Sequence, residues 1–94
     1  MIKNFEDEET GKIYNREWSK KLPVDIHRIA LRKLLMLDAA TDLKDLKVPP
    51  GNMLESLKGR RKGQHSVRIN DQWRICFKWR KGDAYQVGIV DYHK

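Results

Sequence analysis

The most regular pattern of apolar positions lies between residues 23 and 40, where apolar side chains recur every three or four positions. That spacing places them along one face of an α-helix. Pro23 suits the first turn of such a helix, and the Pro-Pro-Gly motif at residues 49–51 ends any helical continuation. We therefore predict a helix over residues 23–40 and a short one over residues 41–46. The apolar face of the longer helix consists of Ile26, Ile29, Ala30, Leu34 and Leu37, widened by Leu31 and Leu35.

Beyond the Pro-Pro-Gly motif the period of the pattern changes from helical to two, which is typical of strands. Turn signals at Asn70-Asp71 and at Lys81-Gly82-Asp83 divide this stretch into three strands. We predict an antiparallel meander with one apolar face, which the long helix covers. Strict alternation assigns to that core face Val67, Ile69, Trp73, Ile75, Phe77, Trp79, Tyr85, Val87 and Ile89. The opposite, open face carries Arg68, Arg74 and Tyr92.

The N-terminal residues carry weaker patterns. Residues 2–5 are typical of a short strand, which the acidic run at residues 6–9 ends because carboxylates are poor strand formers. Residues 10–21 indicate weak helix and loop, with Tyr14 and Trp18 spaced to share a helical face. We predict a single α+β domain over residues 1–94. Its small antiparallel sheet consists of the C-terminal meander and a short N-terminal strand, packed on N-terminal helices.

The net charge of +7 is concentrated toward the C-terminus. Residues 51–94 hold 10 Lys and Arg against 4 Asp and Glu. A concentrated positive field speeds association with polyanions such as nucleic acid. The same charge also suits a solvated face or a surface that binds an acidic protein.

Cysteine use and hydropathy indicate a cytoplasmic protein. Cys76 is the only cysteine, which excludes an intrachain disulfide and fits a reducing compartment. It lies in an apolar run, which favours a packing role over a reactive thiol. No apolar run approaches the roughly 20 residues that cross a bilayer. The acidic N-terminus is unlike a secretory signal, so we expect no association with a membrane.

Arginines on the open face give the sheet a candidate phosphate-binding surface. The guanidinium of Arg68 or Arg74 presents a planar fork of donors and stays charged at any relevant pH. Lys58 and the cluster Arg60-Arg61-Lys62 precede these strands, so we expect the cluster to bind RNA. Exposed strand positions also hold arginine for solubility alone, which is the alternative interpretation.

Asp91, Tyr92 and His93 add candidate acid and base groups beside the arginines. RNA cleavage by the 2′-hydroxyl needs a base, an acid and positive charge on the pentavalent phosphate. Side chains of these types fill all three roles without a metal. The sequence lacks Walker, GxGxxG, HExxH and CxxC motifs, and its histidines are not at metal spacing. We therefore expect neither a cofactor nor a metal site.

Several motifs along the chain are similar to one family. They are Met-Ile-Lys-x-Phe at 1–5, Lys-Leu-x-Met-Leu-Asp-Ala-Ala-Thr at 33–41, Pro-Pro-Gly-Asn at 49–52, Leu-Lys-Gly at 57–59, Ser-Val-Arg-Ile-Asn-Asp-Gln-Trp-Arg-Ile-Cys-Phe at 66–77 and Val-Asp-Tyr-His at 90–93. With these motifs the chain resembles the HigB toxins of bacterial type II toxin–antitoxin systems, in the RelE/ParE superfamily. The resemblance spans essentially the whole chain and implies a RelE-like fold.

This resemblance implies a toxin that cleaves mRNA in the ribosomal A site. It implies active-site roles for Lys58, Arg68, Arg74, Asp91, Tyr92 and His93. It also implies a helix-turn-helix antitoxin of the HigA type as a partner, with operator DNA bound only through the toxin–antitoxin complex. Some relatives carry a histidine where this chain has Glu55. The base is therefore either Glu55 or a function shared by Asp91 and His93.

Two alternatives to a nuclease stay open at this point. ParE-type relatives of the same superfamily inhibit DNA gyrase without cleaving RNA. A basic module that binds RNA without catalysis is the other alternative.

Overall fold

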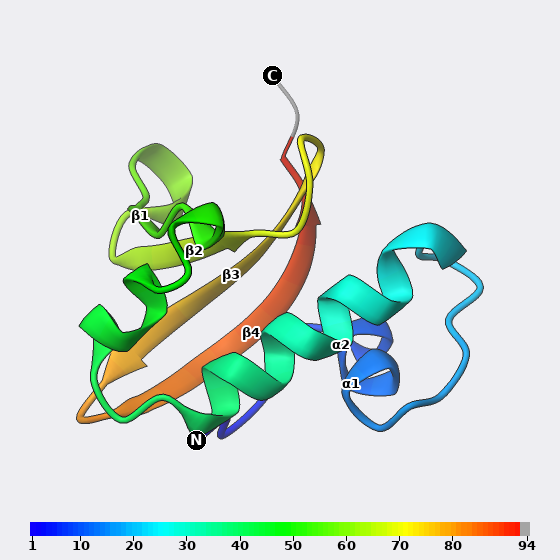
Figure 1. Cartoon of the computed structure of the whole chain (residues 1–94), viewed down its shortest axis with the longest axis horizontal. Coiled ribbons are helices and arrows are strands. Elements are labelled where there is room, and N and C mark those ends of the chain that lie inside the picture. The colour runs from blue at the N-terminus through cyan, green and yellow to red at the C-terminus, as the bar shows by residue number, and fades with distance from the viewer. Residues whose placement is uncertain (93–94) are drawn as a thin grey trace.

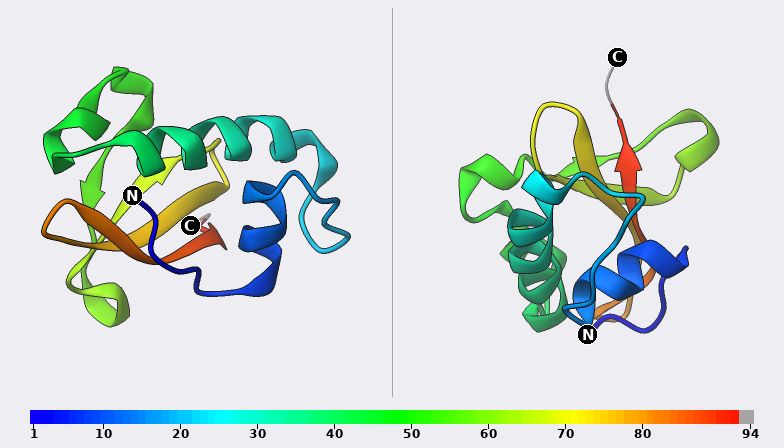
Figure 2. Two further views of the ribbon diagram at one scale, coloured as in Figure 1. Left: turned by 90° about the horizontal axis from the view of Figure 1, so that it is seen from below. Right: turned by 90° about the vertical axis from the view of Figure 1, so that its right-hand side faces the viewer.

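A computed structural model describes residues 1–92 of the chain. Two helices, α1 (Glu8–Tyr14) and α2 (Val24–Ala39), precede a sheet of β1 (Glu55–Ser56), β2 (Gln64–Arg68), β3 (Trp73–Arg80) and β4 (Asp83–Asp91). The short 3₁₀ helices η1 (Leu43–Lys47), η2 (Pro50–Asn52) and η3 (Gly59–Arg61) lie between them. The strands are antiparallel in the order β1-β2-β3-β4, and α2 lies across one face of the sheet (Figures 1 and 2). This arrangement confirms the predicted α+β fold.

Helix α2 and the meander form the core as their hydrophobic patterns predict. Ala30, Leu34 and Leu37 are fully buried against Ile75 and Phe77 from the centre of the sheet. Full burial of a side chain the size of leucine stabilises the fold by roughly 1.5–3 kcal/mol. The predicted widening of the apolar face fails at Leu35, which is 39% exposed.

The chain between α2 and the sheet is also close to prediction. The predicted short helix is the 3₁₀ helix η1, and its Leu46 is buried in the core. Cys76 is fully buried, and burial raises the pKa of its thiol, as a packing role requires. Among the described residues no helix is long and apolar enough to cross a membrane.

The N-terminal region differs from the prediction because its acidic residues begin a helix. Asp7 caps α1 by accepting a hydrogen bond from the Thr10 amide at 2.7 Å. The chain turns away after Phe5, so residues 2–5 make only two isolated parallel bridges to β4 instead of a strand. Helix α1 ends at Tyr14, and Trp18 lies beyond it with its ring 5.1 Å from that of His27.

Two features of the sheet were not predicted. The three strands of the meander are joined by a further strand, β1, which has only two residues and so no alternating pattern of its own. A bulge in β4 sets Tyr85 opposite Lys78 but Gly88 opposite Cys76, so β4 contains one extra residue there. The bulge reverses the alternation at that point. Tyr85 therefore lies on the open face, not on the predicted core face, whereas Val87 and Ile89 are buried in the core.

Asn52 links η2 to the preceding helices, and its removal is expected to destabilise the domain. This buried side chain accepts a hydrogen bond from Lys33 Nζ and donates to the Leu46 carbonyl at 3.1 Å. Burial lowers the pKa of the Lys33 amine, so this amine depends on the contact with Asn52. Asn52→Ala is expected to lower the free energy of unfolding by about 1–3 kcal/mol, measured by urea denaturation. An unchanged urea midpoint in Asn52→Ala would contradict this role; exposed Asn15→Ala is the matched control.

Candidate active site

The register of the sheet brings Glu55, Arg68, Arg74 and Tyr92 to one end of the open face. Glu55 lies opposite Ser66 and Arg68 lies opposite Arg74, so these side chains leave the sheet on the same side. Tyr92 follows β4 on that side, as the alternation predicts. A hollow in the surface is lined by Met53, Glu55, Arg68, Asn70, Asp71, Arg74 and Tyr92.

Arg74 is the most tightly held side chain of this hollow. It is only 8% exposed, its Nε donates to Ser66 Oγ at 2.7 Å, and its Nη2 donates to the Met53 carbonyl at 2.5 Å. Glu55 Oε1 lies 3.5 Å from Arg74 Nη1. These fixed acceptors set the plane of the guanidinium, while Glu55 partly balances its charge. Arg74 thus also joins β3 to the loop before β1.

Arg68 is more loosely held than Arg74. Its Nη2 lies 2.5 Å from Asp71 Oδ1, and the Asp71 carboxylate is 99% exposed. An exposed ion pair of this kind contributes little stability, so an incoming phosphate can replace the carboxylate at low cost. The loop that carries Asp71 is fixed by Asn70, whose Oδ1 accepts from the amides of Gln72 and Trp73. Arg68 is therefore positioned to exchange Asp71 for an anion.

The C-terminal acid and phenol lie on different faces of the sheet. Asp91 is opposite Trp73, a residue of the core-facing set, so its carboxylate points away from Arg74. Asp91 Oδ2 accepts a hydrogen bond from Gln72 Nε2 at 3.2 Å, and the Gln72 carbonyl accepts from the Tyr92 amide at 2.6 Å. Asp91 therefore helps to hold the segment that carries Tyr92. His93 lies outside the described residues.

The predicted basic cluster lies at the far end of β2 from the hollow. Lys58 is exposed at the start of η3, and Leu57 beside it bonds to Gln64, the first residue of β2. Arg68 ends that strand, about 13 Å further along at 3.3 Å per residue. Arg60 and Lys62 are exposed beside Lys58. The structure therefore does not bring Lys58, Arg60, Arg61 or Lys62 into the hollow.

Arg61 is engaged within the protein. Its Nη1 donates to Gln64 Oε1 at 3.0 Å and lies 3.7 Å from Glu6 Oε1. Glu6 in turn lies against Gly88, where an added Cβ would stand 2.5 Å from its Oε2. This pair, which we call the Glu6–Arg61 bridge, covers the middle of the open face over Cys76. A side chain at position 88 would therefore displace the end of the flexible Glu6 side chain.

Sequence reasoning missed three residues of the hollow, Met53, Asn70 and Asp71. The Asn-Asp pair was predicted only as a turn, although turn residues between two arginine-bearing strands are a signal for the site. Met53 contributes its backbone carbonyl from a left-handed conformation, φ 44°, and no side-chain pattern marks such a contribution. Over residues 1–92, His, Cys, Asp and Glu side chains do not form a group of three or more that could hold a metal ion.

Comparisons with known proteins identify the family of the chain. The family model described as the RelE-like toxin of type II toxin–antitoxin system HigB matches residues 3–93. Toxin HigB-1 of Vibrio cholerae is 39% identical over 95 residues, which cover 100% of this chain and 99% of the relative. Endoribonuclease HigB of Proteus vulgaris is 34% identical over 94 residues, which cover 99% of this chain and 100% of the relative. The chain therefore belongs to the HigB-like family of RelE-like toxins from type II toxin–antitoxin systems.

Proposed function

We propose that this toxin is a ribosome-dependent endoribonuclease that cuts mRNA in the ribosomal A site and so stops translation. The observation that carries the proposal is the fixed guanidinium of Arg74 beside the carboxylate of Glu55, in a hollow shared with Arg68 and Tyr92. The name of the Proteus vulgaris relative, an endoribonuclease, supports the same activity. The match to the HigB family does not favour a ParE-like inhibitor of DNA gyrase.

The proposed reaction is attack by a 2′-hydroxyl on the adjacent phosphorus. A base removes the hydroxyl proton as the new oxygen–phosphorus bond forms. The bond to the 5′-oxygen then breaks, and this oxygen takes a proton from an acid. The products are a 2′,3′-cyclic phosphate and a 5′-hydroxyl, so the step needs neither an oxidant nor water.

The geometry favours particular side chains for these roles. Arg74 stabilises the charge that develops on the phosphate. Arg68 does the same once the phosphate has replaced the Asp71 carboxylate as its partner. Glu55 is the described carboxylate nearest Arg74 and is our candidate for the base. Tyr92 lines the hollow, where its ring orients the substrate by stacking on a base. His93 stays our candidate for the acid on the basis of the sequence.

Lys58 and Asp91 receive supporting roles in this proposal. Lys58 lies near Arg60 and Lys62, where the three charges suit docking on ribosomal RNA better than contact with the scissile phosphate. Asp91 acts through Gln72 as a positioning residue for Tyr92. This site acts only when the ribosome holds the mRNA in position for cleavage.

The family implies an antitoxin, and we propose that it is a helix-turn-helix protein of the HigA type. We further propose that the toxin acts in the cytoplasm and reaches operator DNA only through the antitoxin complex. A small reading frame that encodes such a protein next to this one would support the pairing.

Mapping mRNA 5′ ends after induction of the toxin tests the proposed function. We expect new 5′-hydroxyl ends within translated codons, in register with the reading frame, and none in mRNA that is not being translated. Uncut mRNA together with DNA damage would instead indicate gyrase inhibition. Uncut mRNA without DNA damage would indicate a module that binds RNA without catalysis.

A further inference from the structure

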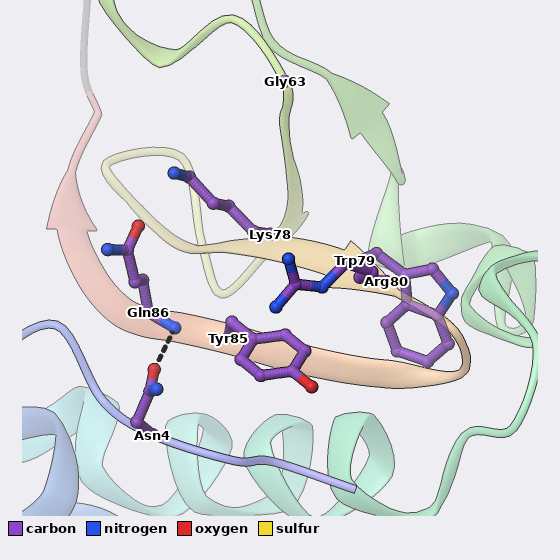
Figure 3. A pocket seen from close by; sticks show the side chains of 7 residues that line it. All are labelled: Asn4, Gly63, Lys78, Trp79, Arg80, Tyr85 and Gln86. Carbon is purple, nitrogen blue, oxygen red and sulfur yellow. Dashed lines mark hydrogen bonds between the residues drawn. The ribbon is translucent and has the colours of Figure 1, made fainter.

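A second hollow lies at the opposite end of the open face, beside the β3–β4 hairpin (Figure 3). Lys78 and Arg80 from β3 and Tyr85 and Gln86 from β4 point into it. The remaining lining residues are Asn4, Gly63 and Trp79. We call this site the hairpin groove. None of its residues belongs to the candidate active site.

The β4 bulge builds this groove at a conformational cost. Gln86 adopts a left-handed conformation, φ 51°, which a residue with a Cβ rarely occupies. Asn4 secures the bulge, because its Oδ1 accepts a hydrogen bond from the Gln86 amide at 2.6 Å (Figure 3). Without the extra residue Tyr85 would face the core. Bulges that redirect a side chain in this way are common next to functional sites.

The redirected Tyr85 stands between two cationic side chains. The Arg80 guanidinium lies over its ring, 4.9 Å from the centroid, and Lys78 lies opposite Tyr85 across the strands. Lys78 and Arg80 are exposed. The nearest acid along the hairpin, Asp83, lies 3.4 Å from the N-terminal amine, which partly balances its charge. An aromatic ring flanked by cations is the combination that binds single-stranded RNA, because bases stack and phosphates pair.

We propose that the hairpin groove binds the same mRNA strand that is cut at Arg74, a few nucleotides away from the scissile phosphate. This inference rests on the proposed function. Arg74, Lys78 and Arg80 leave the same face of β3, and Lys78 is about 13 Å from Arg74 along the strand at 3.3 Å per residue. Lys78 and Arg80 bind phosphate, while Tyr85 holds a base. The groove thereby fixes the register of the strand in the active site.

The Glu6–Arg61 bridge lies between the two hollows. An mRNA strand that occupies both hollows therefore crosses this ion pair. Arg61 there offers a third cation, restrained by Glu6 at 3.7 Å. Loss of the Glu6 charge frees Arg61 for the passing backbone. Glu6→Gln is therefore expected to lower the KM of cleavage severalfold, and a KM that rises would contradict the proposed path.

The test compares Lys78→Ala/Arg80→Ala and Tyr85→Ala with the wild-type toxin on ribosomes programmed with defined mRNAs. On long mRNA we expect each variant to raise the KM about tenfold with little change in kcat. The double variant should also make log KM depend less steeply on log salt concentration. The slope should fall by about 1.4, because each of the two lost phosphate contacts contributes about 0.7 to it. Lys44→Ala/Lys47→Ala removes the same charge from η1 and is the matched control.

Shortening the mRNA on either side of the A-site codon completes the test. The defect of the groove variants should disappear once the mRNA no longer reaches the groove. A defect that persists on every truncated mRNA would mean that the groove docks on ribosomal RNA, and would overturn the proposal. Equal KM values for variants and wild type on long mRNA would overturn it as well. Absence of cleavage by the wild-type toxin would refute the proposed function itself.

Discussion

Arg74→Lys is expected to lower the rate of A-site cleavage by about 10²–10³, the typical effect of removing a donor that stabilises transition-state charge. Lysine keeps the positive charge but lacks the planar fork. It cannot reproduce the bonds from Arg74 Nε to Ser66 and from Nη2 to Met53 while also presenting a donor to the phosphate. The loss should appear in kcat, measured by single-turnover cleavage on programmed ribosomes.

The alanine variant needs a different interpretation. The sequence alone suggests that Arg74→Ala leaves the fold intact. Because Arg74 is buried and joins β3 to the loop before β1, its truncation leaves the Ser66 hydroxyl and the Met53 carbonyl without their donor. We therefore expect Arg74→Ala to lose about 1.5–3 kcal/mol of stability as well as activity.

Arg68→Lys is the matched control for the role of Arg74. Arg68 lies on the same face, but its described ion-pair partner is the exposed Asp71. The lysine variant should thus retain much more activity than Arg74→Lys and the same thermal stability as wild type. Wild-type cleavage by a folded Arg74→Lys protein would refute the proposed role of Arg74.

The elements that the sequence predicts well are those in which one periodic pattern decides the structure. Helix α2 and the three strands of the meander each carry enough apolar positions to define their buried face. The missed elements depend on other forces. Strand β1 has two residues and exists because β2 pairs with it, and α1 begins where the Asp7 carboxylate caps it. A single extra residue in β4 reversed the orientation of Tyr85, which no count of alternating positions reveals.

The candidate site was predictable to the extent that strand parity holds. Arg68, Arg74 and Tyr92 meet because two adjacent strands and the end of a third set them on one face. Consecutive residues of a strand point to opposite faces, so Asp91 lies on the other face although it directly precedes Tyr92. Lys58 is close to the arginines in sequence, but the path of η3 leads it to the other end of β2. In both cases, closeness in the sequence does not predict closeness in the structure.

Glu55→Gln is expected to lower kcat by about 10²–10⁴, the usual contribution of a general base. The amide keeps the size of the side chain but cannot take the 2′-hydroxyl proton. Loss of the negative charge 3.5 Å from Arg74 Nη1 should at the same time strengthen phosphate binding, so KM should fall. A merely structural role for Glu55, which is half exposed at the sheet edge, would change thermal stability and leave kcat intact.

Replacement of the base by histidine distinguishes Glu55 from the residues at the C-terminus. In Glu55→His an imidazole stands at the position of the proposed base, and we expect it to restore part of the lost kcat. The activity of this variant should rise with pH around the ordinary histidine pKa of about 6.5. The pH profile of Glu55→Gln should lack this rise. Asp91→Asn is the matched carboxylate control, and its effect should stay below tenfold because its side chain faces away from Arg74. If Asp91→Asn abolished cleavage while Glu55→Gln did not, Asp91 with His93 would be the proton-transfer pair and Glu55 only the counter-ion of Arg74.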